Sequence, residues 1–216
     1  ERRSSADLLA EHVRLLESGE QAVVARDDGS AEQVLADAPT LVDGTYELPY
    51  LAHATMEPNN AACRMREDGV LDVWASTESP EYSRMSASEA AGIDKERVEV
   101  HVTLAGGSFG LHSSSEHDPT AEAVQIARAL EWKHPVKVQS LREEDFKAGR
   151  YRAMAVHRVR AAADSGGRLT AFHQQIVAEP TSVNLPFVRD VMFTNGIDFF
   201  TTTGAADPPY AFENFK

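Results

Sequence analysis

The chain has 216 residues, 42% of them hydrophobic and 25% charged, which is enough for a domain with a buried core. Its net charge of −13 argues against nucleic-acid binding, because a phosphate-binding surface needs a basic patch and none is visible. The single cysteine, Cys63, excludes an intrachain disulfide and any all-cysteine iron–sulfur or zinc site, and no apolar stretch approaches the roughly 18 residues that span a bilayer.

The first 40 residues show helical patterns and no motif. Leucines recur at helical spacing over residues 4–18 and predict an amphipathic helix. Asp27-Asp28-Gly29 predicts a turn, and residues 31–36 predict a short helix. We expect residues 1–40 to form a lead-in segment that packs against the rest of the chain.

From Leu41 the pattern changes to strands with helices between them. Residues 61–65 and 70–75 flank the Glu67-Asp68-Gly69 turn and predict a hairpin. Pro80–Ala91 is predicted as a helix that Gly92 closes. The other predicted elements are strands at 46–49, 97–103 and 136–138, and a helix that starts near Asp118-Pro119 and buries Ala123, Ile126, Ala127 and Leu130.

The last third of the chain contains one clear supersecondary signal. Residues 155–163 and 168–178 predict a second hairpin across Asp164-Ser165-Gly166-Gly167. Beyond Glu179 the periodicity is weak, so 181–216 is expected to be a loop-rich extension that continues into a further or separate part. Strands and helices without regular alternation indicate an α+β fold with mixed or antiparallel sheets. The predicted division is therefore 1–40, a domain at 41–180, and 181–216.

A glycine-rich segment stands between the strand at 97–103 and the following helix. Its sequence is Leu104-Ala105-Gly106-Gly107-Ser108-Phe109-Gly110. Because glycine lacks Cβ, successive N–H groups of such a loop can converge on one anionic or oxo ligand. The alternative interpretation of this glycine cluster is a plain tight turn.

Further motifs accompany this loop in a consistent order. They are Tyr50-Leu51-Ala52-His53-Ala54-Thr55-Met56-Glu57-Pro58-Asn59-Asn60-Ala61-Ala62, Val73-Trp74-Ala75-Ser76-Thr77-Glu78-Ser79-Pro80, Ala91-Gly92-Ile93, Glu122-Ala123, Pro135-Val136-Lys137-Val138 and Leu141-Arg142-Glu143-Glu144-Asp145. Together they resemble the molybdopterin-binding subunit of the xanthine dehydrogenase and aldehyde oxidase family, in particular the bacterial isoquinoline 1-oxidoreductase beta-subunit type. The resemblance runs from about Val42 to Leu169.

The resemblance implies a molybdenum ion held by molybdopterin, usually in the cytosine dinucleotide form, without a metal ligand from the protein. Gly106, Gly107, Phe109 and Gly110 match the family's loop, and Ser108 replaces a third glycine. These five are the candidate cofactor-binding residues. We expect the Phe109 amide to point at the molybdenum oxo group and its ring to wall the substrate pocket; the alternative for Phe109 is a core aromatic.

Several positions depart from the family's pattern. Glu78 stands where the family carries a glutamine that donates to the oxo ligand, and an ionised carboxylate can only accept hydrogen bonds. Leu111-His112 stand where this branch shows two arginines suited to phosphate. The family's catalytic glutamate lies C-terminal to anything present. Glu78 and Glu57 are the candidate catalytic residues, as acid or base of an enzyme that uses the pocket without the cofactor. The alternative for Glu57 is that it shapes the turn beside the pocket.

Potential metal ligands also gather at His112, Glu116, His117 and Asp118. Their spacing through a serine-rich stretch does not define a coordination geometry. We therefore predict a solvated loop with a helix cap there and no metal site. Cys63 is predicted to be a small buried hydrophobe, and the charged run at 142–145 a helix start.

Three functions remain open at this point. In the first, the chain is part of a molybdenum hydroxylase large subunit that oxidises or hydroxylates an aldehyde or N-heterocycle. It then needs a complementary large-subunit chain or C-terminal part, and an iron–sulfur small subunit that carries the [2Fe-2S] clusters. In the second, it is a degenerate relative that lost the cofactor and uses the pocket for other chemistry or binding. In the third, it is a non-catalytic assembly module. A bacterial cytoplasm and a periplasm are both compatible with the sequence.

Overall fold

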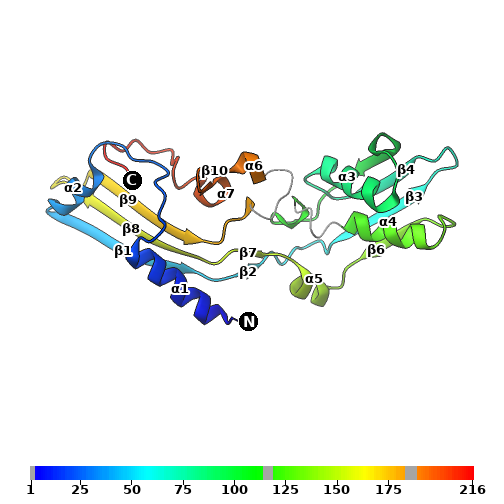
Figure 1. The fold of residues 1–216 in the computed structure, drawn as a ribbon, viewed down its shortest axis with the longest axis horizontal. Coiled ribbons are helices and arrows are strands. Elements are labelled where there is room, and N and C mark those ends of the chain that lie inside the picture. Colours follow the sequence, from blue (N-terminus) through cyan, green and yellow to red (C-terminus); the bar gives the residue numbers. More distant parts are fainter. Residues whose placement is uncertain (1–2, 114–118, 183–188) are drawn as a thin grey trace. The chain divides into compact units, whose positions relative to one another are not determined.

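The computed structural model describes residues 3–113, 119–182 and 189–216. The chain folds into two compact units (Figure 1). Unit 1 consists of Glu1–Leu51 and Ala153–Lys216, and unit 2 of Ala52–Arg152. Each unit contains its own sheet with helices on it, which agrees with the predicted α+β class.

A three-stranded antiparallel sheet in the order β1-β8-β9 forms the centre of unit 1. Its strands and helices are α1 (Ser5–Ser18), α2 (Ala31–Ala36), β1 (Thr40–Leu48), β8 (Ala155–Ala163) and β9 (Leu169–Ala178). Both helices contact β8 and β9, and Leu35 of α2 is buried with Ala162 and Ala171. The β8–β9 hairpin was predicted, and its turn places Gly167 at φ 81°, a conformation that favours glycine.

Helix α1 is capped at both ends. The Ser4 N–H donates to the Asp7 carboxylate at 2.9 Å and the Asp7 N–H donates to Ser4 Oγ at 3.2 Å, which forms a capping box. The helix ends at Gly19, whose φ is 64°. On its predicted apolar face, His12 and Leu16 are buried.

Short elements follow Glu179, where a loop was predicted. They are α6 (Arg189–Met192), β10 (Phe193–Thr194), β11 (Ile197–Asp198) and α7 (Phe199–Thr202). The buried Asp198 carboxylate accepts the backbone N–H groups of Thr181 at 3.0 Å, Ser182 at 3.2 Å and Thr201 at 3.2 Å. Local capping of this kind, which hydrophobic periodicity does not reveal, explains why the prediction missed these elements.

Unit 2 contains a four-stranded mixed sheet in the order β5-β4-β3-β6. Its main elements are β3 (Asn60–Met65), β4 (Leu71–Ala75), α3 (Pro80–Ala91), β5 (Val98–Val102), α4 (Pro119–Ala129) and β6 (Val136–Gln139). Strands β4 and β5 are parallel, whereas β3 is antiparallel to β4 and β6. Helices α3 and α4 pack together over the buried side chains of the sheet, among them Cys63, Leu71 and Val73 (Figure 1). The β3–β4 hairpin, helix α3 and the burial of Cys63 were all predicted.

The buried face of α4 differs from the predicted one. Ala123 and Ala127 are buried as predicted, but Ile126 and Leu130 are 40% and 48% exposed. Val124 is fully buried instead. Small residues face the core because α4 lies close to both α3 and β3.

Shorter elements complete the described chain: β2 (Leu51–Ala52), η1 (Lys95–Arg97), η2 (Leu111–Ser113), α5 (Arg142–Ala148) and β7 (Tyr151–Arg152). The unit limits differ from the predicted division at residues 40 and 180. The reason is that β1 pairs along its whole length with β8, more than a hundred residues later. Both ends of the chain therefore belong to the same unit.

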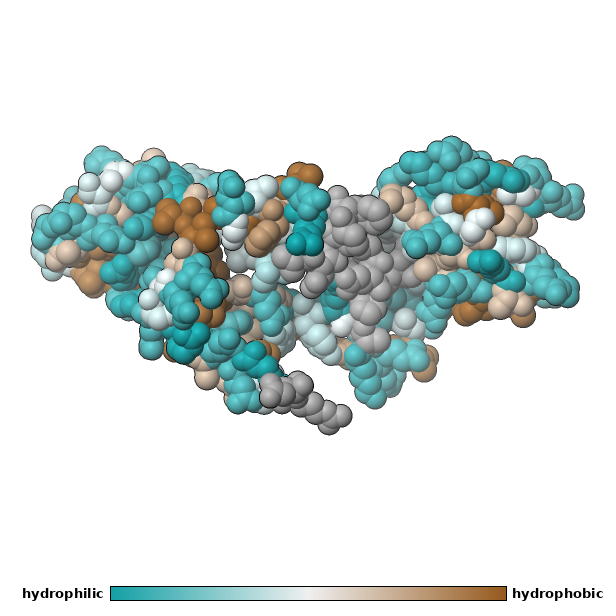
Figure 2. Space-filling model, in the orientation of Figure 1, coloured by the Kyte–Doolittle hydropathy of each residue, from teal (hydrophilic) through white to brown (hydrophobic). Residues whose placement is uncertain are grey.

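One face of the molecule is mainly polar. On the face shown in Figure 2, hydrophilic residues cover most of each unit and hydrophobic residues form small separate patches. None of the helices in the described part of the chain combines the length and the apolar character needed to cross a bilayer.

Candidate functional site

The glycine-rich segment forms an exposed loop that leads from β5 to η2. Three of its residues have a positive φ: 104° at Gly107, 52° at Phe109 and 98° at Gly110. Its first half is anchored to residues 56 and 57, because the Gly106 N–H donates to Glu57 Oε2 at 2.6 Å and the Met56 N–H donates to the Gly107 carbonyl at 3.0 Å. The loop is thus held from one side by a neighbouring segment.

Consecutive backbone donors in this loop have no acceptor. Within residues 3–113, 119–182 and 189–216, the N–H groups of Gly107, Ser108 and Phe109 make no hydrogen bond. The donors on either side are engaged: Gly106 bonds to Glu57, and Gly110 donates weakly to Ser108 Oγ at 3.3 Å. Because the loop is exposed, water can satisfy these donors, and a ligand that presents oxygen atoms can replace that water, so this stretch is a candidate binding site.

The side chains of the loop point in opposite directions. Phe109 is 63% exposed, so the alternative of a core aromatic is wrong. Ser108 is buried, and its hydroxyl donates to the Glu78 carboxylate. The predicted cofactor-binding residues and the candidate Glu78 therefore lie together.

Glu57 accepts hydrogen bonds on both of its carboxylate oxygens. While Oε2 holds Gly106, Oε1 accepts from Asn60 Nδ2 at 2.8 Å and from Ser76 Oγ at 2.9 Å. Partial burial works to raise the pKa of Glu57, but the hydrogen bonds from Gly106, Asn60 and Ser76 outweigh it, so this pKa lies below its ordinary value. A carboxylate kept ionised by three donors is a poor proton donor at neutral pH.

Leu111 and His112, which stand in place of two arginines, have packing and backbone roles. Leu111 is 4% exposed. The His112 carbonyl accepts the Glu78 N–H at 3.2 Å, and His112 Nδ1 lies 2.8 Å from the Ser76 carbonyl, so Nδ1 carries the proton there. These two residues hold the loop against the end of β4 and offer no bidentate donor to a phosphate.

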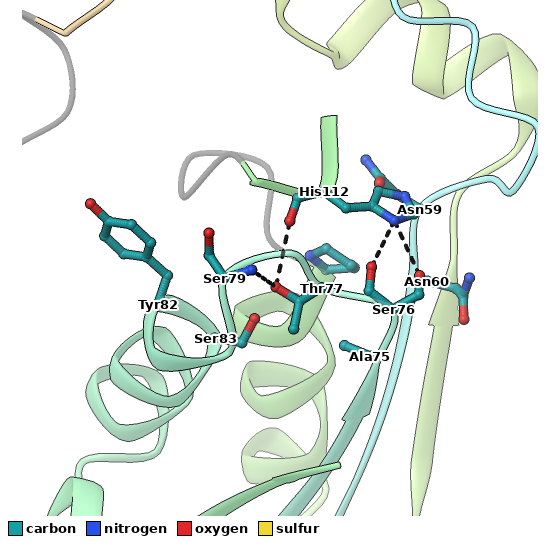
Figure 3. Close-up of a pocket in the computed structure, with 10 residues that line it drawn as sticks. Asn59, Asn60, Ala75, Ser76, Thr77, Ser79, Tyr82, Ser83 and His112 are labelled. Carbon is teal, nitrogen blue, oxygen red and sulfur yellow. Dashed lines mark hydrogen bonds between the residues drawn. The ribbon is translucent and has the colours of Figure 1, made fainter. Parts of the chain in front are cut away.

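A shallow pocket of about 20 Å³, open to solvent, lies beside this network. Figure 3 shows the His112 ring directed at Ser76, with the first turn of α3 on the opposite side. The pocket is lined by Asn59, Asn60, Ala75, Ser76, Thr77, Ser79, Tyr82, Ser83, His112 and Pro119. Thr77 connects its two sides, since its Oγ1 accepts the Ser79 N–H at 3.0 Å and contacts the His112 carbonyl at 3.4 Å.

Of the suggested metal-ligand group, only His112 can be placed, because Glu116, His117 and Asp118 lie outside the described residues. The structure brings together a different group, Asp72, Glu99 and His101, whose ligand atoms lie within 4.8 Å of one another. The sequence analysis did not identify this group. The available signal was the alternation of polar residues along the adjacent strands β4 and β5, which places Asp72, Glu99 and His101 close together.

Two guanidinium groups already pair with this second group. Arg64 contacts Asp72 at 2.9 Å, and Arg66 contacts Glu99 at 2.8 Å. His101 lies 2.9 Å from Asp72 and stacks on Trp74 with a ring separation of 5.0 Å. The negative charge is thus compensated within the protein, which favours an ion-pair network on the sheet over a cation site.

The loop fits a cofactor that is bound through oxo or phosphate oxygens. Such a group needs several N–H donors within reach, and the N–H groups of Gly107, Ser108 and Phe109, on a largely exposed segment, have no acceptor among the described residues. A Cβ added at Gly107 would lie 3.6 Å from Met56 Cβ and 3.7 Å from Phe109 Cζ, beside the open amides. Glu78 does not fit the role of an oxo donor, because its ionised carboxylate only accepts hydrogen bonds.

Comparison with known proteins agrees with this geometry. Residues 16–197 match the molybdopterin cofactor-binding domain, and the chain belongs to this family. A probable xanthine dehydrogenase subunit of Bacillus subtilis (strain 168) is 26% identical over 194 residues, which cover 83% of this chain and 26% of that protein. Isoquinoline 1-oxidoreductase subunit beta of Brevundimonas diminuta is 31% identical over 127 residues, or 58% of this chain and 16% of the relative.

Solved structures share the fold. The aldehyde oxidoreductase from Desulfovibrio gigas superposes with a TM-score of 0.60 and 20% identity over 77% of this chain and 18% of that one. Quinoline 2-oxidoreductase from Pseudomonas putida 86 gives a TM-score of 0.59, with 20% identity over 77% of this chain and 22% of that one. The chain thus spans about a quarter or less of the length of these relatives. The predicted family and the α+β fold are confirmed.

Proposed function

We propose that the chain supplies the glycine-loop part of a molybdopterin site in a molybdenum hydroxylase large subunit, with the cofactor in its cytosine dinucleotide form and an aldehyde or N-heterocycle as substrate. The observation that carries this proposal is the run of N–H groups at Gly107, Ser108 and Phe109 that have no acceptor among the described residues, in a chain of the molybdopterin cofactor-binding family. When bound, the cofactor supplies the two-electron oxidation of the substrate.

The loop residues have distinct tasks in this proposal. The amides of Gly107, Ser108 and Phe109 donate to oxygen atoms of the cofactor, and because the backbone already holds them in place, little reorganisation is needed on binding. The exposed Phe109 ring forms a wall of the substrate pocket and keeps water from the reacting carbon. Gly106 and Gly110 shape the two ends of the loop.

Glu78 is the proposed acid or base of this part of the site. Its carboxylate accepts a hydrogen bond from the Ser108 hydroxyl. Glu78 therefore lies beside the loop, next to the residue that precedes Phe109, and has oxygen lone pairs that could accept a proton. The variant Glu78→Gln tests this role. We expect it to retain the cofactor and to lose turnover; unchanged turnover would show that Glu78 accepts no proton.

Partner subunits are the next part of this proposal. The given sequence has one cysteine, Cys63, which is buried in unit 2. We propose that electrons leave through a [2Fe-2S] protein and that a complementary large-subunit chain or C-terminal part closes the cofactor site. The names of several relatives describe them as subunits.

The experiment that tests the function is cofactor analysis of the native assembly that contains this chain. We expect about one molybdenum and one pterin per copy, and release of cytidine monophosphate on hydrolysis. Release of the pterin without cytidine monophosphate would contradict the proposed cytosine dinucleotide form of the cofactor. An assembly without molybdenum and pterin would refute the proposed function.

A further inference from the structure

We propose that Glu57 is a positioning residue: its carboxylate fixes the first peptide of the glycine loop and thereby directs the next three amides toward the bound group. This inference rests on the proposed function of the loop. It assigns no acid or base role to Glu57 and agrees with the alternative, given from the sequence, that Glu57 shapes the turn beside the pocket.

The contacts of Glu57 form a bridge between the sheet and the loop. Asn60 at the start of β3 and Ser76 directly after β4 donate to Oε1 at 2.8 and 2.9 Å. Oε2, the other end of the same rigid carboxylate, accepts the Gly106 N–H at 2.6 Å. The position of the Gly106 peptide is therefore set by two residues of the sheet, although the loop itself is exposed.

Only a carboxylate satisfies all of these donors. Three donors converge on two oxygens, and both oxygens of an ionised carboxylate accept hydrogen bonds. In a glutamine one oxygen is replaced by an NH₂ group, which would face either the two donors from the sheet or the donor from the loop. Hydrogen bonds to a charged acceptor are also stronger than those between neutral groups. The arrangement is thus specific for glutamate.

Backbone contacts around Glu57 reinforce the direction of the loop. The Met56 N–H donates to the Gly107 carbonyl at 3.0 Å, so two successive peptides of the loop are tied to residues 56 and 57. A Cβ built at Gly106 would lie 3.0 Å from Glu57 Cβ, which shows how closely the two segments approach. The Gly106 amide is thus occupied by Glu57, whereas no described residue accepts from the amides of Gly107, Ser108 and Phe109.

The test compares Glu57→Gln and Glu57→Ala with the wild-type chain. Amide NMR of the complete 216-residue chain reports the exchange rate of each loop N–H. We expect the Gly106 amide to be protected in the wild type and to exchange at least about tenfold faster in both variants, while Gly107 and Phe109 exchange fast in all of them. Glu89→Gln, at an exposed position of α3, is the matched control and should leave Gly106 unchanged.

A second readout connects this contact with the cofactor. In the native assembly, both Glu57 variants should carry several-fold less molybdenum than the wild type and the Glu89 control. Gly106→Ala tests the same contact from the loop side, since its Cβ would push against Glu57, and should give a similar loss.

The outcomes separate the two proposals. Unchanged Gly106 exchange, or full molybdenum in Glu57→Gln, overturns the positioning role while the proposed function stands. A wild-type assembly without molybdenum overturns the proposed function even if Gly106 depends on Glu57, and the positioning role toward a cofactor falls with it.

Discussion

Replacement of Gly107 by alanine examines the conformation on which the candidate site depends. Gly107 has a φ of 104°, a region that side-chain-bearing residues avoid. A Cβ there meets no atom closer than 3.6 Å, so the effect of Gly107→Ala comes from backbone strain and not from a clash. Strain of this kind costs about 1–3 kcal/mol. The loop is exposed and can relieve the strain by turning its peptides, which changes the directions of the loop amides.

The same strain gives the size of the expected effect on binding. If the cofactor must restore the strained loop, its affinity falls by about 5- to 140-fold, at 1.4 kcal/mol for each factor of ten. Molybdenum content and cofactor dissociation from the native assembly measure this loss. Gly204→Ala is the control, because Gly204 also has a positive φ, 79°, and nothing within 4 Å, but lies in unit 1. Equal cofactor retention in the two variants would show that cofactor binding does not depend on the conformation of Gly107.

Three further predictions concern unit 2. Leu71→Ala removes most of a fully buried side chain and should lower the free energy of unfolding, measured by urea titration, by about 2–5 kcal/mol. The control is Leu104→Ala, at a position that is 98% exposed, which should change this free energy by less than about 0.5 kcal/mol. Burial works to raise the pKa of Asp72, but hydrogen bonds from His101 and Arg64 outweigh it, so its pKa lies below 3.8. The stability that Asp72 contributes is then complete above about pH 5 and is lost as the pH falls through the folded-state pKa. Asp72→Asn should cost about 1–3 kcal/mol at neutral pH and progressively less in acid; a pH-independent difference would contradict the ion-pair network. Burial raises the pKa of Cys63 to about 11, so iodoacetamide should not modify it at neutral pH until denaturant is added.

Local patterns predicted the parts of the fold whose partners are close in sequence. The β3–β4 and β8–β9 hairpins follow from alternating strands around glycine turns, and α3 follows from a proline start and a glycine stop. Such signals need only a few neighbouring residues. They can therefore be recognised without any knowledge of the tertiary structure.

Contacts distant in sequence could not be predicted in this way. The pairing of β1 with β8 decides the composition of unit 1, and no local pattern specifies it. The same holds at the site, where Glu57 and Gly106 are 49 residues apart. The sequence indicated that both residues belong to motifs of one family. Only the structure shows that they form a hydrogen bond and that Asn60 and Ser76 also donate to the Glu57 carboxylate.

Hydrogen exchange of the loop in the native assembly, measured with and without the cofactor, shows whether the loop amides bind the cofactor. We expect the amides of Gly107, Ser108 and Phe109 to be protected only when the cofactor is bound, while Gly106 stays protected in both forms. Equal exchange of the three amides in the two forms would contradict this expectation, because the donors would then not contact the cofactor.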